Sequence, residues 1–189
     1  VGAMGVAALR VTLSWSKLQE VVRQTMSTVG SIIWLVLGAV SLVGIYNIIG
    51  GASFLKGIFT GLDFHPLLII LMMMGILLIL GTFMEWIAIV FITVPIFAPV
   101  VLELAPRLGM QEEWVAVWFG VLFVMNMQVY FLSPPFGPAC FWMKSVAPKD
   151  VTLQEIFVSV LPFMALQVIG IVLVMAVPDI ALYLPKLLK

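Results

Sequence analysis

Charge is what this sequence has least of. Only 10% of its 189 residues are charged while 63% are hydrophobic, and residues 24–55, 114–143 and 156–178 contain no Asp, Glu, Lys or Arg. Each of these intervals is longer than the roughly 20 apolar residues that a helix needs to cross a bilayer. The scarcity of charge excludes a soluble globular domain and predicts an all-α, multi-pass protein of the lipid bilayer.

The sequence also lacks the side chains that build metal and catalytic centres. A single cysteine, Cys140, excludes an intrachain disulfide, and for the single histidine, His65, an interfacial role is favoured over metal binding. Nine basic and nine acidic residues leave no net charge, so we expect no nucleic-acid partner. Without a nucleophile–base pair, a metal cluster or a phosphate-binding loop in the sequence, we expect no enzymatic activity and no organic cofactor.

Residues 66–102 are apolar except at their centre, residues 81–85 (GTFME). One straight helix of this length would far exceed a bilayer, whereas two arms of about fifteen residues, at 1.5 Å per residue, fall short of its ~30 Å core. The arithmetic favours a re-entrant helical hairpin over residues 65–105 that enters and leaves the membrane on one side. The alternative is an ordinary hairpin of two full spans, with Gly81 and Thr82 in its turn at the far interface.

A second irregularity lies at residues 131–141, FLSPPFGPACF. Proline removes backbone donors and clashes with the preceding helical turn, so Pro134, Pro135 and Pro138 must interrupt the helix. A broken helix inside a membrane exposes backbone groups that can hold a cation or a carboxylate. Such backbone is tolerated only where protein buries it or where it lines a watery cavity. Two irregularities in one chain therefore indicate a transporter.

The remaining pattern divides the chain into segments. Residues 1–26 are interpreted as the tail of a helix and an amphipathic cytoplasmic segment, and residues 27–63 as a span and a short arm helix. The hairpin of residues 65–105 follows, then a broken span over residues 113–150. A last span and tail occupy residues 152–189 and begin at a capping box of Thr152 and Glu155. The start of the chain inside a helix leads us to expect a fragment of a longer permease.

The basic residues suggest an orientation. If the hairpin returns to its own side, five basic residues share one membrane face and four share the other, which places the larger set in the cytoplasm and opens the hairpin to the outside. The larger set is Arg10, Lys17, Arg23, Lys144 and Lys149, and the smaller set is Lys56, Arg107, Lys186 and Lys189.

The stretches GTFMEWIAIVFITVPIFAPVV and VMNMQVYFLSPPFGPACF, with the later PFMALQVIG, resemble the large (DctM-like) membrane subunit of tripartite ATP-independent periplasmic (TRAP) transporters. The resemblance covers essentially all 189 residues and falls in the C-terminal half of that family. It implies that the chain is one inverted repeat of an elevator-type transporter in the bacterial inner membrane. This transporter would use a sodium gradient to take up an organic acid. It also implies two partners, a small membrane subunit and a periplasmic substrate-binding protein.

The resemblance further implies a sodium ion, the coupling ion, between the hairpin tip and the break of the same repeat. Sodium is a hard cation, and hard cations prefer oxygen ligands. For Glu85, a structural role capping the second arm is an equal alternative to ion binding, since an acid suits a helix N-terminus. The implied contributors are Gly81, Thr82, Glu85, Ser133, Pro134 and Gly137.

Asn126, Gln128 and Tyr130 precede the break and are our candidates for lining the substrate path, although helix packing is favoured for Gln128. Two residues depart from the family pattern, because the tip acid is Glu85 rather than Asp and Tyr130 stands where Gly is common. Two alternatives stay open, a carrier of the divalent-anion/sodium symporter type and a structural membrane subunit that transports nothing. The sequence does not identify the substrate.

Overall fold

The computed structural model describes residues 14–61, 64–134 and 137–188, and within them all regular structure is helical. The helix tail expected within residues 1–9 lies outside this described part, as do Arg10 and Pro135. Among the described residues, four helices are long and apolar enough to cross a membrane, and the molecule is an integral membrane protein. They are α2 (Trp15–Ile48), α5 (Trp86–Leu104), α6 (Glu112–Leu132) and α8 (Leu153–Ala176).

Helix α2 corrects one expectation. The amphipathic segment and the first span, predicted as separate elements that meet near residue 26, form one uninterrupted helix of 34 residues. At 1.5 Å per residue it is about 51 Å long, well beyond the ~30 Å bilayer core. The polar residues around the expected boundary do not break it, because Thr28 and Ser31 donate their hydroxyl protons to the carbonyls of Gln24 and Ser27 in the preceding turn.

The hairpin consists of α4 (Pro66–Gly81) and α5, joined by the turn at residues 82–85. His65 caps α4, since its Nδ1 accepts the Leu67 N–H at 3.3 Å. The arms have 16 and 19 residues, so the expectation of two arms of about fifteen is wrong for α5. Helix α5 continues through its two internal prolines to Leu104, and its length alone therefore does not distinguish a re-entrant arm from a full crossing.

The predicted break is confirmed. Helix α6 ends at Leu132, and α7 (Pro138–Val146) begins after Gly137. The capping box that starts α8 is also present, with the Glu155 N–H donating to Thr152 Oγ1 and the Thr152 N–H donating to the Glu155 carboxylate. The shorter helices are α3 (Gly51–Gly61), the 3-10 turn η1 (Pro106–Leu108) and α9 (Asp179–Leu187).

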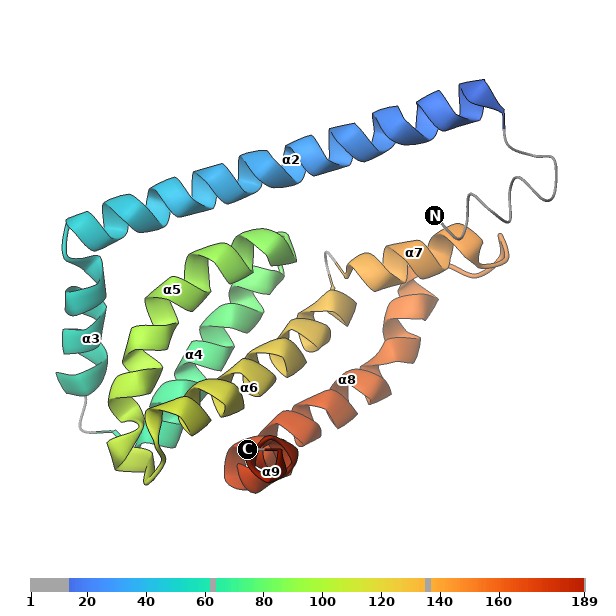
Figure 1. The fold of residues 1–189 in the computed structure, drawn as a ribbon. Helices are drawn as coiled ribbons and strands as arrows, with labels where there is room; N and C mark the ends of the chain where they lie inside the picture. The colour runs from blue at the N-terminus through green and yellow to red at the C-terminus, as the bar shows by residue number, and fades with distance from the viewer. Residues whose placement is uncertain (1–13, 62–63, 135–136, 189) are drawn as a thin grey trace.

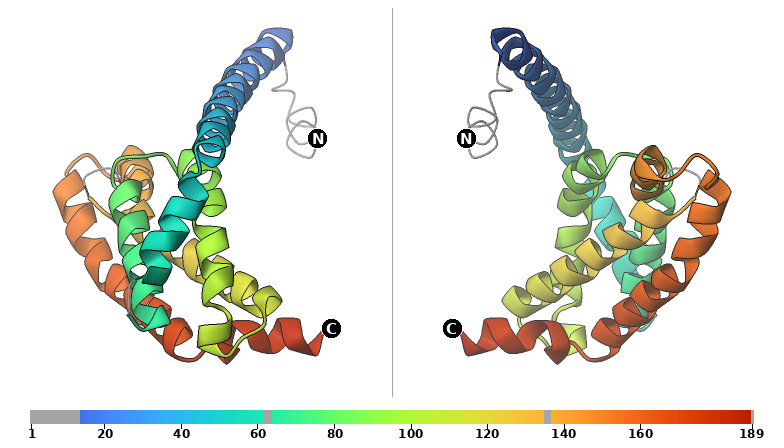
Figure 2. Two further views of the ribbon diagram at one scale, coloured as in Figure 1. Left: turned by 90° about the vertical axis from the view of Figure 1, so that its left-hand side faces the viewer. Right: turned by 90° about the vertical axis from the view of Figure 1, so that its right-hand side faces the viewer.

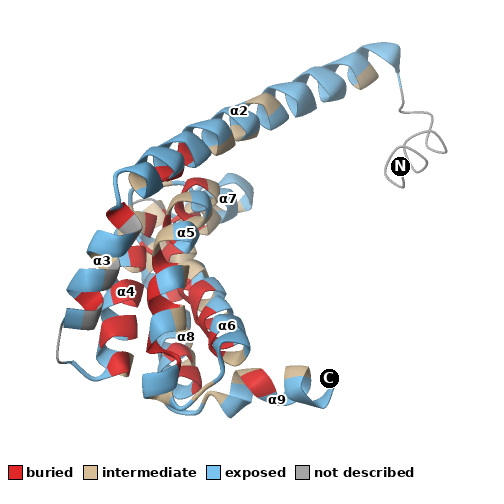
Figure 3. Cartoon of the chain, turned by 60° about the vertical axis from the view of Figure 1, so that its left-hand side comes forward, coloured by how far each residue is buried: buried red, intermediate tan, exposed pale blue. Residues whose placement is uncertain are grey.

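The core lies between the hairpin, α6 and α8, as the buried positions in Figure 3 show. Its centre is built from α4 and α6, for example Met73, Leu77 and Leu122, and the Trp118 indole donates to the Val174 carbonyl of α8 at 2.8 Å. Helix α2 lies across the end of the hairpin and contacts α5 (Figure 1). It projects away from the packed body (Figure 2), with most of its surface apolar and exposed, as suits a helix that lipid or protein surrounds.

Candidate ion and substrate site at the hairpin tip

The hairpin turn is closed by its own backbone. The N–H groups of Thr82, Phe83 and Met84 donate to the carbonyls of Ile79 and Leu80, which ends α4 tightly. Glu85 then starts α5, because its carboxylate accepts the Ile87 N–H at 2.9 Å. The structure thus shows the capping arrangement that we weighed for Glu85. One carboxylate oxygen makes this bond, and the exposed side chain can still present its other oxygen to a ligand.

The break is equally compact where the structure describes it. Ser133 is buried and caps α6, and its carbonyl accepts the Gly137 N–H at 2.8 Å. Gly137 has φ 12° and ψ 72°, and a Cβ there would lie 2.8 Å from the Phe157 ring and 3.1 Å from the Ser133 carbonyl oxygen. Only a residue without a side chain fits this close approach. Pro134, at the start of the break, is exposed.

The hairpin tip lies against the end of α6 that precedes the break, because Gly81 contacts Tyr130. A Cβ placed on Gly81 would lie 2.4 Å from Cγ of Tyr130, so the tyrosine ring rests on the bare backbone of the last α4 residue. Tyr130 occupies the last turn of α6, three residues before Ser133. Residues far apart in the sequence, from the predicted tip and from the predicted break, are therefore neighbours.

The local hydrogen bonds leave oxygen atoms suited to a cation. Thr82 donates its hydroxyl proton to the Ile79 carbonyl at 2.6 Å, and Ser133 donates to the Val129 carbonyl at 2.8 Å. Both hydroxyl oxygens keep lone pairs, which hard cations coordinate. In addition, α4 and α6 both end here, and the C-terminal end of a helix carries partial negative charge on carbonyls that lack helical partners.

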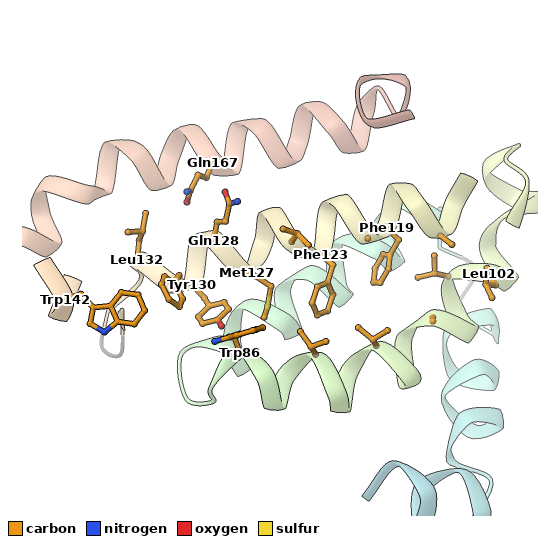
Figure 4. Close-up of a pocket in the computed structure, with 18 residues that line it drawn as sticks. Trp86, Leu102, Phe119, Phe123, Met127, Gln128, Tyr130, Leu132, Trp142 and Gln167 are labelled. Atoms are coloured by element: carbon orange, nitrogen blue, oxygen red, sulfur yellow. The ribbon is translucent and has the colours of Figure 1, made fainter. Parts of the chain in front are cut away.

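Of the three candidates for the substrate path, two line a groove and one is committed elsewhere. The buried Asn126 amide donates to the Met74 carbonyl in the middle of α4 at 3.0 Å, which ties the hairpin to α6. Gln128 and Tyr130 line a groove of about 1000 Å³ along α5 and α6. In Figure 4, Tyr130 lies beside Trp86 at the tip end of this groove, and Gln128 faces Gln167 of α8.

Sequence reasoning missed Trp86 and Gln167 as lining residues. Gln167 is the single amide of α8 beyond Gln154 in its first turn, a signal that could have been used, but its direction depends on how α8 packs against α6. Trp86 follows Glu85 at the start of α5. That it lies beside Tyr130 is visible only in the folded structure. Within the described residues no group of three or more His, Cys, Asp or Glu side chains could hold a metal ion.

Comparison with known proteins assigns the family. The family model described as the tripartite ATP-independent periplasmic transporter, DctM component, matches residues 1–180. The chain is 28% identical over 176 residues to the sialic acid TRAP transporter large permease protein SiaM of Vibrio cholerae, an alignment that covers 93% of this chain and 39% of that protein. It is 38% identical over 128 residues to the C4-dicarboxylate TRAP transporter large permease protein DctM of Rhodobacter capsulatus, covering 68% of this chain and 26% of that protein.

A third relative is the isethionate TRAP transporter permease protein DctMQ of Oleidesulfovibrio alaskensis, 33% identical over 123 residues, which covers 65% of this chain and 18% of that protein. The chain thus spans well under half the length of each of these relatives. The tip motif, the Pro-rich arm and the break all fall inside the matched region. This chain belongs to the DctM component family of the tripartite ATP-independent periplasmic transporters.

Proposed function

We propose that this chain is one inverted repeat of a sodium-coupled, elevator-type permease that takes up an organic acid across the bacterial inner membrane. The observation that supports it is the contact between Gly81 and Tyr130, which joins the hairpin tip to the break. The names of the relatives support the substrate class, since sialic acid, C4-dicarboxylates and isethionate are all organic anions. The tripartite family implies the partners, a periplasmic binding protein and a small membrane subunit.

The coupling ion in this proposal is sodium, bound between the tip and the break. Thr82 and Ser133 offer hydroxyl oxygens, and the ends of α4 and α6 offer carbonyls and the negative ends of two helix dipoles. The close approach of Gly81 to Tyr130 brings the end of α4 to the end of α6. Glu85 adds a negative charge close enough to Tyr130 to interact with it electrostatically, which favours a cation at the same place.

The proposed substrate lies next to the ion, in the groove that runs from Tyr130 along α5 and α6. Helix α7 begins near this junction, and the N-terminal end of a helix favours a carboxylate. At the start of α5 the Glu85 carboxylate already fills this role. An anion and a cation that bind side by side offset each other's charge in a low-dielectric site, so each increases the affinity of the site for the other. Such mutual dependence is the physical basis of symport.

Sodium binding can be tested without knowing the substrate. A ligand that binds the native state raises its thermal stability, so the complete permease should unfold at a higher temperature in NaCl than in KCl of equal concentration. We expect Thr82→Val and Ser133→Ala to raise the sodium concentration for half-maximal stabilisation roughly tenfold, because a tenfold change corresponds to the ~1.4 kcal/mol that one lost ligand is worth. Sodium-driven uptake in proteoliposomes should weaken in parallel.

Matched variants control for the loss of a hydroxyl. Thr93 on α5 and Ser159 on α8 also donate to carbonyls of their own helices, at 2.7 Å in both cases, yet they lie away from the tip turn and the break. Thr93→Val and Ser159→Ala should therefore leave the sodium response unchanged. If Thr82→Val and Ser133→Ala respond to sodium like these controls, the ion is bound elsewhere and this site assignment is wrong.

A further inference from the structure

Two buried oxygen atoms of the groove have no partner among the described residues. They are Tyr130 Oη and Gln167 Oε1, and Tyr46 Oη on α2 is the third such atom in the described part of the chain. Buried polar atoms in proteins are nearly always hydrogen-bonded, so an orphan indicates a partner that the described residues do not supply. Two of the three orphans line the same groove.

The positions of these two atoms give the groove a polarity. Tyr130, only 2% exposed, lies at the tip end, where the ring packs on Gly81 and the hydroxyl lies beside Trp86 (Figure 4). Its O–H is a donor that suits a carboxylate. Gln167 and Gln128 face each other across the gap between α8 and α6, and two amides can serve one neutral polar group as donor or acceptor.

The rest of the groove is apolar. Its described lining contains no Lys, Arg, Asp or Glu, and aromatic and aliphatic side chains such as Phe119, Phe123, Val94 and Met127 form its length. A second carboxylate there would lose its hydration without gaining an opposite charge, and a chain of hydroxyls would lose water without gaining partners. An apolar ligand has no polar groups to dehydrate, and its burial in the groove is favourable. The groove therefore discriminates against diacids and polyhydroxylated acids.

We infer that this groove takes a monocarboxylic acid with an apolar body of aromatic size, whose carboxylate accepts a hydrogen bond from Tyr130. The amides of Gln128 and Gln167 hold at most one further neutral polar group of the same molecule. This inference rests on the proposed function and narrows its substrate class. It separates this chain from the relatives named for sialic acid and C4-dicarboxylates, whose substrates are polyhydroxylated or doubly charged.

Ligand titration of the purified complete permease, followed by thermal unfolding, tests this inference. In saturating NaCl, phenylacetate should stabilise the protein at concentrations at least tenfold lower than succinate or sialic acid. Tyr130→Phe removes only the hydroxyl and should weaken phenylacetate binding about tenfold, because the buried carboxylate loses one charge-assisted hydrogen bond. Tyr46→Phe removes the other orphan tyrosine hydroxyl, away from the groove, and should leave phenylacetate binding unchanged.

The outcomes separate this inference from the proposed function. If sodium stabilises the permease and succinate or sialic acid binds more tightly than phenylacetate, the substrate class is wrong and the proposed symport stands. If Tyr130→Phe binds phenylacetate like Tyr46→Phe, the carboxylate does not bind at Tyr130 and the inference is overturned. If sodium has no effect on stability and no acid binds, the proposed function fails together with the inference.

Discussion

At the scale of single residues, the glycine at the hairpin tip decides how closely the tip approaches α6. Gly81 contacts the Tyr130 ring, and the ring cannot retreat easily because Tyr130 is buried. A methyl group at this position would overlap three side-chain atoms of Tyr130, Cγ, Cδ1 and Cβ, at 2.4, 2.7 and 2.8 Å. Real Cβ atoms do not approach others so closely, so either the hairpin or the ring must move.

We predict that Gly81→Ala destabilises the permease by about 1–3 kcal/mol, the usual cost of overpacking a filled core. Gly75 on the same helix is the matched control, since a Cβ there has nothing within 4 Å. Gly75→Ala should be neutral or stabilising by up to ~1 kcal/mol, because alanine favours a helix more than glycine does. Chemical or thermal unfolding of both variants measures the difference. Equal stabilities would mean that the tip does not rest on Tyr130.

At the scale of helices, the sequence predicts best where one residue type acts locally. The prolines of residues 134–138 predicted the break between α6 and α7, and Thr152 with Glu155 predicted the start of α8. Prediction was weaker where the length of a helix depends on several neighbouring residues. The expected arm of about fifteen residues is too short for α5, which runs through Pro95 and Pro99 to 19 residues, since freed backbone groups in a membrane helix can find other partners.

The continuity of α2 was missed for a related reason. Charged and hydroxyl residues near its start look like an interfacial segment, but hydroxyl groups that donate to their own helix do not end it. The site shows the same limit. Each half of the site was visible in a local motif. The contacts between the halves depend on packing between helices and were not predicted. These contacts are the approach of Gly81 to Tyr130, the hydrogen bond from Asn126 to Met74, and the facing amides of Gln128 and Gln167.

The depth of the hairpin tip is testable by cysteine labelling. Phe83 in the turn is 76% exposed and can be replaced by cysteine after the native thiol is removed with Cys140→Ala. If the hairpin is re-entrant from outside, a membrane-impermeant maleimide added to the cytoplasmic face should label Phe83→Cys much more slowly than Asp150→Cys, which lies in the exposed α7–α8 connection. Equal rates would indicate a hairpin of two full crossings and would remove the proposed mid-membrane ion site.

At the scale of the whole molecule, the connections lie at two ends. The start of α2 and the α7–α8 connection are at one end in Figure 1, and η1 and the α8–α9 connection are at the other. At each end a basic side chain donates a hydrogen bond to a backbone carbonyl. Arg107 donates to the Phe64 carbonyl at 2.8 Å, and Lys144 donates to the Val151 carbonyl at 2.5 Å. Basic residues at a membrane surface are retained preferentially in the cytoplasm.

This arrangement predicts the orientation. Lys17 and Arg23 lie in the first part of α2, and Lys144 and Lys149 lie in and after α7, so we expect this end in the cytoplasm and η1 in the periplasm. Alkaline phosphatase, which is active only outside the cytoplasm, should be active when fused after Met110 of the complete permease and inactive when fused after Asp150. A fluorescent protein that matures only in the cytoplasm should give the reverse pattern. If the fusion after Asp150 is active and the fusion after Met110 is inactive, the open end of the hairpin faces the cytoplasm. A periplasmic binding protein could not deliver an acid to it there.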